Sequence, residues 1–282
     1  MKKVLISCDS TADFSPELLK KFDILNFPVI VIMDDKPYRD GVDVKSTDIF
    51  EYYKRTGKLA RTVAPNINDY LTFFGPLVEQ GYEIVHFNIS TALSGTHNIC
   101  NMAAAEYDCV YPIDSHSVST GIALLALRAC KLRDEGKTAR EIVDAIVGEA
   151  GNVDASFTLD TLTYLSKGGR CSSLMAMGAN ILKLKPCIES VDGALAVGKK
   201  YRGKYEDVII SYIKDRLADK SGLDTDVAFI THTCSDNALV QKCVQTAREA
   251  GGFEEVYDTA AGPAISVHCG PNTLGVLFMR RK

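Results

Sequence analysis

Short hydrophobic runs alternate with segments of helical spacing through the first half of the chain. Runs that predict buried strands cover residues 4–7, 27–33, 83–89 and 109–113. Helix start signals separate them, and these are Ser15 with Pro16, Ser46, Asn66, and the capping box of Thr138 and Glu141. Regular alternation of strands and helices is typical of a doubly wound parallel sheet with helices on both faces.

The pattern changes near residue 154, where hairpin signals join the helices. Asp192 and Gly193 separate two strand-like runs, which is a strong signal for a two-residue hairpin. A Met-rich helix is predicted over Met175–Leu184, as pocket wall or as core filler. We therefore predict an α/β protein of two domains around a ligand cleft: residues 1–153 with a doubly wound parallel sheet, and residues 154–282 with a mixed sheet.

Composition excludes several classes of function. The chain has 282 residues, 46% of them hydrophobic and 24% charged, and a net charge of −4 without a basic block, so nucleic acid is not an expected partner. No apolar run approaches the ~20 residues of a membrane span. Nine cysteines stand without a C-x-x-C pair, which favours reduced thiols in a cytoplasmic protein. The five histidines lack metal spacing, so we expect no metal, and His86 is interpreted as a core residue.

Polar side chains follow the predicted strands where ligands bind in doubly wound sheets. They are Asp9 to Thr11, Ser90 to Thr96, Asp114 to Ser119, and Thr62 between two helices. The segment Glu83–Thr96 is the most informative, because a buried strand delivers hydroxyls and free N–H groups to a helix start, where an anion is favoured. The alternative is that these residues only cap the helices that follow.

His268 lies in SVHCGPNTLG, just before Gly270 and Pro271. We interpret this segment as a tight turn that directs the imidazole into the cleft, although a loop histidine without a role has the same pattern. Together with Ser94, His268 would either hold an anion or form a nucleophile pair.

Six motifs stand in one order along the chain: DSTAD (9–13), YRDGVD (38–43), STALSGT (90–96), LDTLTYLSKGGR (159–170), LKPCIESVDG (184–193) and HCGPN (268–272). Together they closely resemble the DegV family of bacterial fatty-acid-binding proteins. The resemblance implies one long-chain fatty acid, such as palmitate, buried between the domains, with Thr62, Ser94 and His268 holding its carboxylate. TVAP stands here where the family has TSQP, and Asn272 replaces a glycine of the turn.

The resemblance also implies a carrier without a catalytic residue or cofactor of its own. Such a protein presents the fatty acid to a separate ATP-dependent kinase that forms the acyl-phosphate, and it contacts a membrane peripherally during ligand exchange. Lys167, Arg170 and Arg202 match basic positions of the kinase-docking surface, though basic loops are often merely solvated.

Two other functions compete with the carrier. A hydrolase would use Ser94 as nucleophile and His268 as base, but the segment ALSGT lacks the G-x-S-x-G elbow. A nucleotide or sugar-phosphate binder would use the helix-start anion site, but the chain has no G-x-x-x-x-G-K-[ST] loop.

Overall fold

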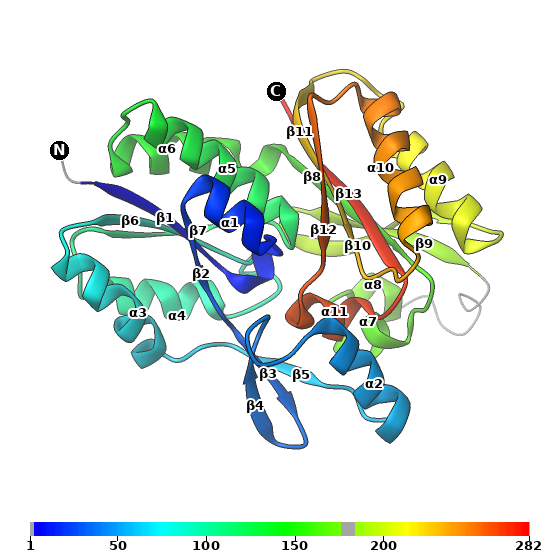
Figure 1. Ribbon diagram of the computed structural model, residues 1–282, viewed down its shortest axis with the longest axis horizontal. Helices are drawn as coiled ribbons and strands as arrows, with labels where there is room; N and C mark the ends of the chain where they lie inside the picture. Colours follow the sequence, from blue (N-terminus) through cyan, green and yellow to red (C-terminus); the bar gives the residue numbers. More distant parts are fainter. Residues whose placement is uncertain (1–2, 176–183, 282) are drawn as a thin grey trace.

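The computed structural model describes residues 3–175 and 184–281, and its first sheet is fully parallel (Figure 1). The strand order is β2-β1-β6-β7, so the order reverses between β1 and β6. Helices α5 and α6 cover one face and α3 and α4 the other. The strands are β1 (Val4–Asp9), β2 (Ile24–Phe27), β6 (Glu83–Asn88) and β7 (Val110–Asp114), and the helices α1 (Pro16–Phe22), α3 (Ile67–Glu79), α4 (Thr96–Ala104), α5 (Thr120–Asp134) and α6 (Ala139–Glu149). The predicted doubly wound sheet is confirmed.

Three of the four predicted start signals form caps in the structure, whereas Ser46 is itself the first residue of α2 (Ser46–Thr56) and its hydroxyl donates to the Ala261 carbonyl. The Ser15 hydroxyl accepts a hydrogen bond from the Leu18 N–H, and Pro16 is the first residue of α1. Reciprocal capping boxes join Asn66 to Asp69 and Thr138 to Glu141. Such caps satisfy N–H groups that a helix leaves unpaired at its start.

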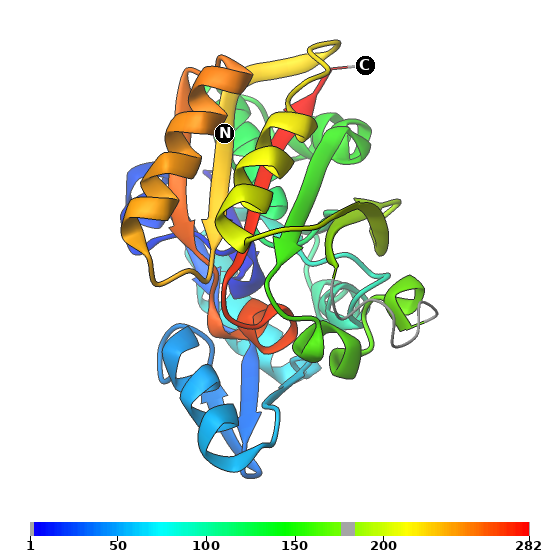
Figure 2. The ribbon, with the colours of Figure 1, turned by 90° about the vertical axis from the view of Figure 1, so that its right-hand side faces the viewer.

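The second sheet is mixed, as predicted, with the order β10-β9-β8-β13-β11-β12. Only its β11 and β12 pair in parallel. Asp192 and Gly193 both have positive φ and form the predicted tight hairpin between β9 and β10. Helices α9 and α10 cover the outer face (Figure 2). The elements are β8 (Val153–Leu159), β9 (Lys185–Val191), β10 (Ala194–Tyr201), α9 (Tyr205–Arg216), β11 (Leu223–His232), α10 (Asn237–Gly251), β12 (Glu255–Ala260) and β13 (Thr273–Arg280).

Helix α5 lies between the two large sheets and packs against both. Ile122, Leu125 and Ala129 face the core of the parallel sheet. Ala123 and Leu124 pack with Phe229 and other residues of the mixed sheet. A helix covered on two sides is apolar around most of its circumference, which the sequence of α5 shows.

A third, small sheet corrects the prediction of one strand over residues 27–33. The chain leaves the parallel sheet after β2 and begins a separate strand, β3 (Ile30–Met33). β3 pairs with β4 (Lys36–Arg39) and with β5 (Arg61–Val63), both antiparallel. With α2 (Ser46–Thr56), this sheet packs against α11 (Pro263–Cys269), which the sequence predicted as a turn. Thr62, predicted between helices, therefore lies on strand β5.

Four short elements complete the chain: η1 (Ser10–Ala12), η2 (Ala150–Asn152), α7 (Thr163–Gly168) and α8 (Ser172–Met175). The predicted Met-rich helix lies outside the described residues from 176 to 183. The boundary between residues 153 and 154 falls at the start of β8 and stays a prediction. Among the described helices, none is long and apolar enough to span a bilayer.

Candidate functional site

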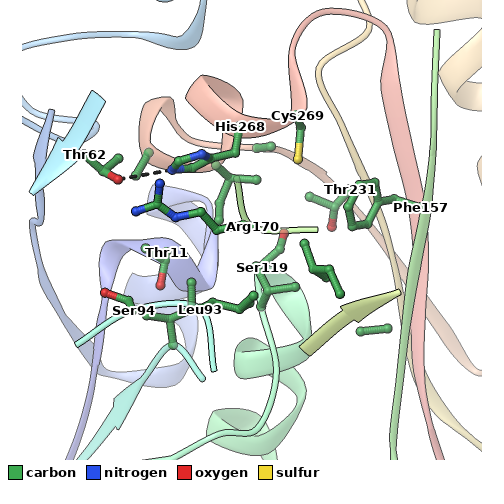
Figure 3. Close-up of a pocket in the computed structure, with 18 of the residues that line it drawn as sticks. Thr11, Thr62, Leu93, Ser94, Ser119, Phe157, Arg170, Thr231, His268 and Cys269 are labelled. Carbon is green, nitrogen blue, oxygen red and sulfur yellow. Dashed lines mark hydrogen bonds between the residues drawn. The ribbon is translucent and has the colours of Figure 1, made fainter. Parts of the chain in front are cut away.

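A pocket lies where the two large sheets and α11 meet. The empty space inside it, counted together with its open mouth, is about 1020 Å³. Most of its wall is apolar, and the side chains that form this wall include Leu93, Val118, Phe157, Leu165, Leu195 and Ile265. Polar side chains gather at one end, where Thr62, Ser94, Arg170 and His268 are found (Figure 3). The pocket therefore suits a ligand with a long apolar part and one polar end.

Ser94 stands in the loop that joins β6 to α4, at the carboxyl end of the parallel sheet. Its backbone N–H donates to the Ser90 carbonyl, at 3.1 Å. Its hydroxyl lies 2.7 Å from the Thr96 hydroxyl and accepts a longer bond from the Thr96 N–H, at 3.3 Å. Ser94 is therefore held locally at the helix start, as predicted, with a half-buried side chain in the pocket wall.

Thr62 and His268 are brought together from positions 206 residues apart. Thr62 comes from β5 of the small sheet, and His268 from the last turn of α11. The Thr62 hydroxyl lies 3.1 Å from His268 Nε2 (Figure 3). His268 is bonded to Thr62, and Ser94 to Thr96, so the structure does not form a Ser94–His268 nucleophile pair.

The imidazole of His268 is kept neutral by its surroundings. Burial and, to a smaller extent, the positive charge of Arg170 together lower its pKa to about 4. Its Nδ1 is shielded from solvent and has no hydrogen-bond partner among the described residues. A side chain at Gly168 would place its Cβ 2.7 Å from Nδ1, so the ring fits only because residue 168 is a glycine.

Arg170, which is predicted as a docking residue, is exposed and also lines the pocket, so its role in docking stays a prediction. The side chain points toward Thr62 and His268 (Figure 3). Gly169 ends α7 with φ +71°, a conformation that favours glycine, and so turns the chain at this point. Arg170 Nη1 then donates to the Gly168 carbonyl at 2.7 Å. Its role in the pocket was missed because the direction of an arginine in KGGR depends on this turn.

The other two predicted docking residues lie outside the pocket wall. Lys167 is exposed on α7, with its ammonium 5.9 Å from the centre of the Tyr53 ring. Arg202 is exposed just after β10. Their role in docking stays a prediction.

The apolar end of the pocket also contains Thr231, but its hydroxyl is not free. It lies 2.6 Å from the Thr120 hydroxyl and 3.0 Å from the Thr259 hydroxyl. A hydroxyl with both partners in place adds little polarity to the wall. Among residues 3–175 and 184–281, no group of three His, Cys, Asp or Glu side chains is placed to hold a metal ion.

Fold and pocket together define a two-domain α/β protein with a largely apolar ligand pocket between its domains. A sequence profile described as "Uncharacterised protein, DegV family" matches residues 3–281. The chain belongs to the DegV family.

Relatives of known structure or name share this fold. A protein of Thermotoga maritima named fatty acid-binding protein is 29% identical over 97% of this chain and 96% of its own length. A stearic acid-binding protein from Eubacterium ventriosum superposes with a TM-score of 0.87 at 25% identity, covering 100% of this chain and 99% of its own. A DegV family protein from Thermus thermophilus gives a TM-score of 0.91 at 24% identity, covering 99% of this chain and 100% of its own. Members of the family thus bind fatty acids.

Proposed function

We propose that this protein binds one long-chain fatty acid, such as palmitate, with its tail in the apolar pocket. Thr62, Ser94 and His268 hold the carboxylate, and Arg170 supplies the positive charge. One observation carries the proposal, which is that these four polar side chains converge on one end of an otherwise apolar pocket.

The tail supplies most of the affinity. Fourteen methylenes contribute about 11 kcal/mol before the entropy of ordering and association is subtracted, at about 0.8 kcal/mol each. A buried carboxylate, in contrast, costs several kcal/mol unless it is hydrogen-bonded or paired. The hydroxyls and the guanidinium offset that cost, and they make the pocket prefer an acid over a neutral lipid.

The hydrogen bonds at the head group have a direction. A carboxylate only accepts, so the Thr62 hydroxyl must donate to it. Thr62 Oγ1 then accepts from His268, whose proton must therefore sit on Nε2, so His268 holds the carboxylate through Thr62 and not by a bond of its own. This assignment agrees with the depressed pKa of His268 and with an Nδ1 that faces Gly168 without a donor.

The head group would be presented at the pocket mouth to a separate ATP-dependent kinase, which forms the acyl-phosphate. The resemblance suggests this step, and the basic side chains of Lys167 and Arg202 are exposed as a docking role requires. The nine free cysteines suit the reducing cytoplasm. Val63, in the pocket wall, is 40% exposed and suits a brief membrane contact during ligand exchange.

Ligand identity is tested by native mass spectrometry of the purified protein, and the head-group site by the variants Thr62→Val and Ser94→Ala. Each removes one hydroxyl, and we expect palmitate affinity to fall about 10- to 100-fold, because a lost donor to a buried charge costs about 1–3 kcal/mol. Thr246→Val is the matched control, since this hydroxyl bonds only within α10. Unchanged palmitate binding in the double variant would contradict the site.

Docking is tested separately. Arg202→Glu should abolish kinase-dependent phosphorylation and leave palmitate binding intact. Arg170 does not serve for this test, because its guanidinium lies in the pocket wall. Labelling of Ser94 by a fluorophosphonate, together with ester turnover, would instead favour the hydrolase.

A further inference from the structure

Two buried carboxylates hold the first turn of α11, the helix that presents His268 to the pocket. Asp13 comes from the DSTAD segment and Asp40 from YRDGVD, and neither has a role in the head-group site. Asp13 Oδ1 accepts from the Gly262 N–H at 2.8 Å, and Asp40 Oδ1 accepts from the Ala264 N–H at 2.9 Å. Both bonds cross from the first half of the chain to its last helix.

Each carboxylate is itself fixed from behind. Asp13 Oδ2 accepts from the Ser119 hydroxyl at 2.5 Å, and Asp40 Oδ2 accepts from the Ser10 hydroxyl at 2.6 Å. The two groups also lie close together, because a Cβ at Gly262 would be 3.1 Å from Asp13 Oδ1 and 3.5 Å from Asp40 Oδ1. Asp13 and Asp40, held by the Ser119 and Ser10 hydroxyls, thus form a polar socket that binds the start of α11.

This socket is unfavourable for stability. Asp13 and Asp40 are only 4% and 1% exposed. The pKa of Asp13 is raised well above its usual range, mainly by burial and then by the Asp40 and Asp9 carboxylates, and that of Asp40 is raised to about 6, mainly by burial and then by Asp9. Two carboxyl groups desolvated side by side cost free energy of folding, which their hydrogen bonds offset only in part. Their position at α11 therefore calls for a role in the site.

The other end of α11 explains what the socket controls. The helix has seven residues, so it is about 10 Å long at 1.5 Å per residue. Ala264, Ile265 and His268 lie on its pocket side. A two-turn helix moves as one piece, so a shift at Gly262 or Ala264 changes the distance between His268 Nε2 and Thr62.

We propose that Asp13 and Asp40 are positioning residues that set the place of His268 by fixing the first turn of α11. The inference rests on the proposed function, in which His268 and Thr62 bind a carboxylate. The hydrogen bonds from α11 to Asp13 and Asp40 are present without ligand, so they should also set the place of His268 in the ligand-free protein.

The test compares palmitate with hexadecanol, which has the same tail and a neutral head group. In Asp13→Ala and Asp40→Ala we expect palmitate affinity to fall about tenfold or more, as for a lost hydrogen bond to a charged group. Hexadecanol affinity should change less than about threefold, because α11 keeps its apolar contacts. Asp13→Asn and Asp40→Asn keep an acceptor oxygen, so they should recover most of the palmitate affinity.

A spectroscopic readout separates positioning from general destabilisation. The ¹³C–¹H signal of the His268 ring, assigned with His268→Gln, should move in the two Ala variants without ligand. It should stay in place in Ile213→Ala, which removes a core side chain of α9 far from α11. In a His268→Ala background, Asp40→Ala should cause no further loss of palmitate affinity.

Gly262→Ala disturbs the same contact from the helix side and leaves both carboxylates present. Its Cβ would press on Asp13 Oδ1, so the His268 signal should again move and palmitate affinity should fall. If Asp13→Ala and Asp40→Ala do not fold, Gly262→Ala tests whether the first turn of α11 sets the place of His268.

Three results would overturn the inference: an unmoved His268 signal, equal losses for palmitate and hexadecanol, or Asn variants as weak as the Ala variants. Failure of the wild-type protein to bind palmitate would instead count against the proposed function. The His268 signal still tests positioning in that case, because it is recorded without ligand.

Discussion

Two histidines, His86 and His268, have similar local chemistry and opposite surroundings. His86 lies on β6 with Nδ1 2.8 Å from the Ser7 hydroxyl and a buried Nε2 without a partner among the described residues. His268 likewise has one nitrogen beside a hydroxyl and the other shielded and unpaired. Burial lowers the pKa of His86 to about 3 and that of His268 to about 4.

The neighbours distinguish the two residues. His86 is enclosed by the rings of Phe27, Tyr70, Phe73 and Phe74, whose centres lie 5.3–6.2 Å away. His268 instead borders a pocket and faces Thr62 and Arg170. A depressed pKa and an unpaired nitrogen are therefore shared by both residues, and it is the adjoining pocket with its convergent polar groups that makes His268 the candidate site residue.

The largest contrast is expected from truncating each ring. His86→Ala should lower the free energy of unfolding by about 2–4 kcal/mol, because it leaves a cavity in an aromatic core. Palmitate affinity of the folded protein should be unchanged. His268→Ala should show the reverse, with affinity lost about tenfold or more and a smaller loss of stability. Chemical denaturation and calorimetric titration of both variants measure this, and weaker palmitate binding in His86→Ala would remove the contrast.

Acid should destabilise the folded protein through protonation of both His86 and His268. Bound ligand should reduce this loss of stability at His268 only. Both folded pKa values lie below the unfolded value of about 6.5, so the unfolded chain binds more protons and stability falls as the pH drops below 6.5. At pH 5 each ring accounts for a loss of about 2 kcal/mol.

The contribution of each ring is isolated by subtracting the free energy of unfolding of His86→Leu or His268→Leu from that of wild type between pH 7 and 5. Asp13 and Asp40, whose pKa values are raised, contribute equally to both proteins and cancel in this difference. Bound palmitate should reduce the acid loss of His268 alone, since a carboxylate nearby raises its pKa. If palmitate changed the pH-dependent stability contributions of His86 and His268 equally, the contrast between the two residues would be wrong.

The smallest effect is expected at Gly168, beside the His268 ring. Gly168→Ala should lower palmitate affinity by about tenfold or less, because the new Cβ would displace a ring 2.7 Å away. Gly148→Ala is the matched control: this helical glycine has open space around it, and alanine there should be neutral or slightly stabilising. Palmitate affinity at Gly168→Ala equal to wild type would show that the ring has room to move.

Most of the fold could be predicted from local patterns, and the errors have physical causes. Residues 27–33 are continuously apolar, so nothing in their periodicity showed that the chain changes sheets near Pro28. Helix α11 was missed because it is buried nearly all round and lacks an amphipathic period. Pro263 at its start and Gly270 after its end were the signals available.

The head-group site was only partly accessible to sequence reasoning. Ser94 follows a strand at a helix start, so its position could be reasoned locally. Thr62 and His268 are candidates on local grounds, but they meet only because the small sheet packs on α11, and their joint role at a carboxylate follows from the family resemblance. The direction of Arg170 depends on the turn at Gly169, and the roles of Asp13 and Asp40 depend on tertiary contacts that no local pattern reports.

Helix α5 packs against both large sheets, which limits the routes by which a ligand can enter the pocket. A hinge motion that separated the two domains would break the contacts of Leu124 with Phe229 and Leu277 and expose these apolar side chains to water. We therefore expect the two large sheets to unfold in one cooperative transition. For the same reason we expect a ligand to enter the pocket through local displacement of loops rather than through separation of the two large sheets.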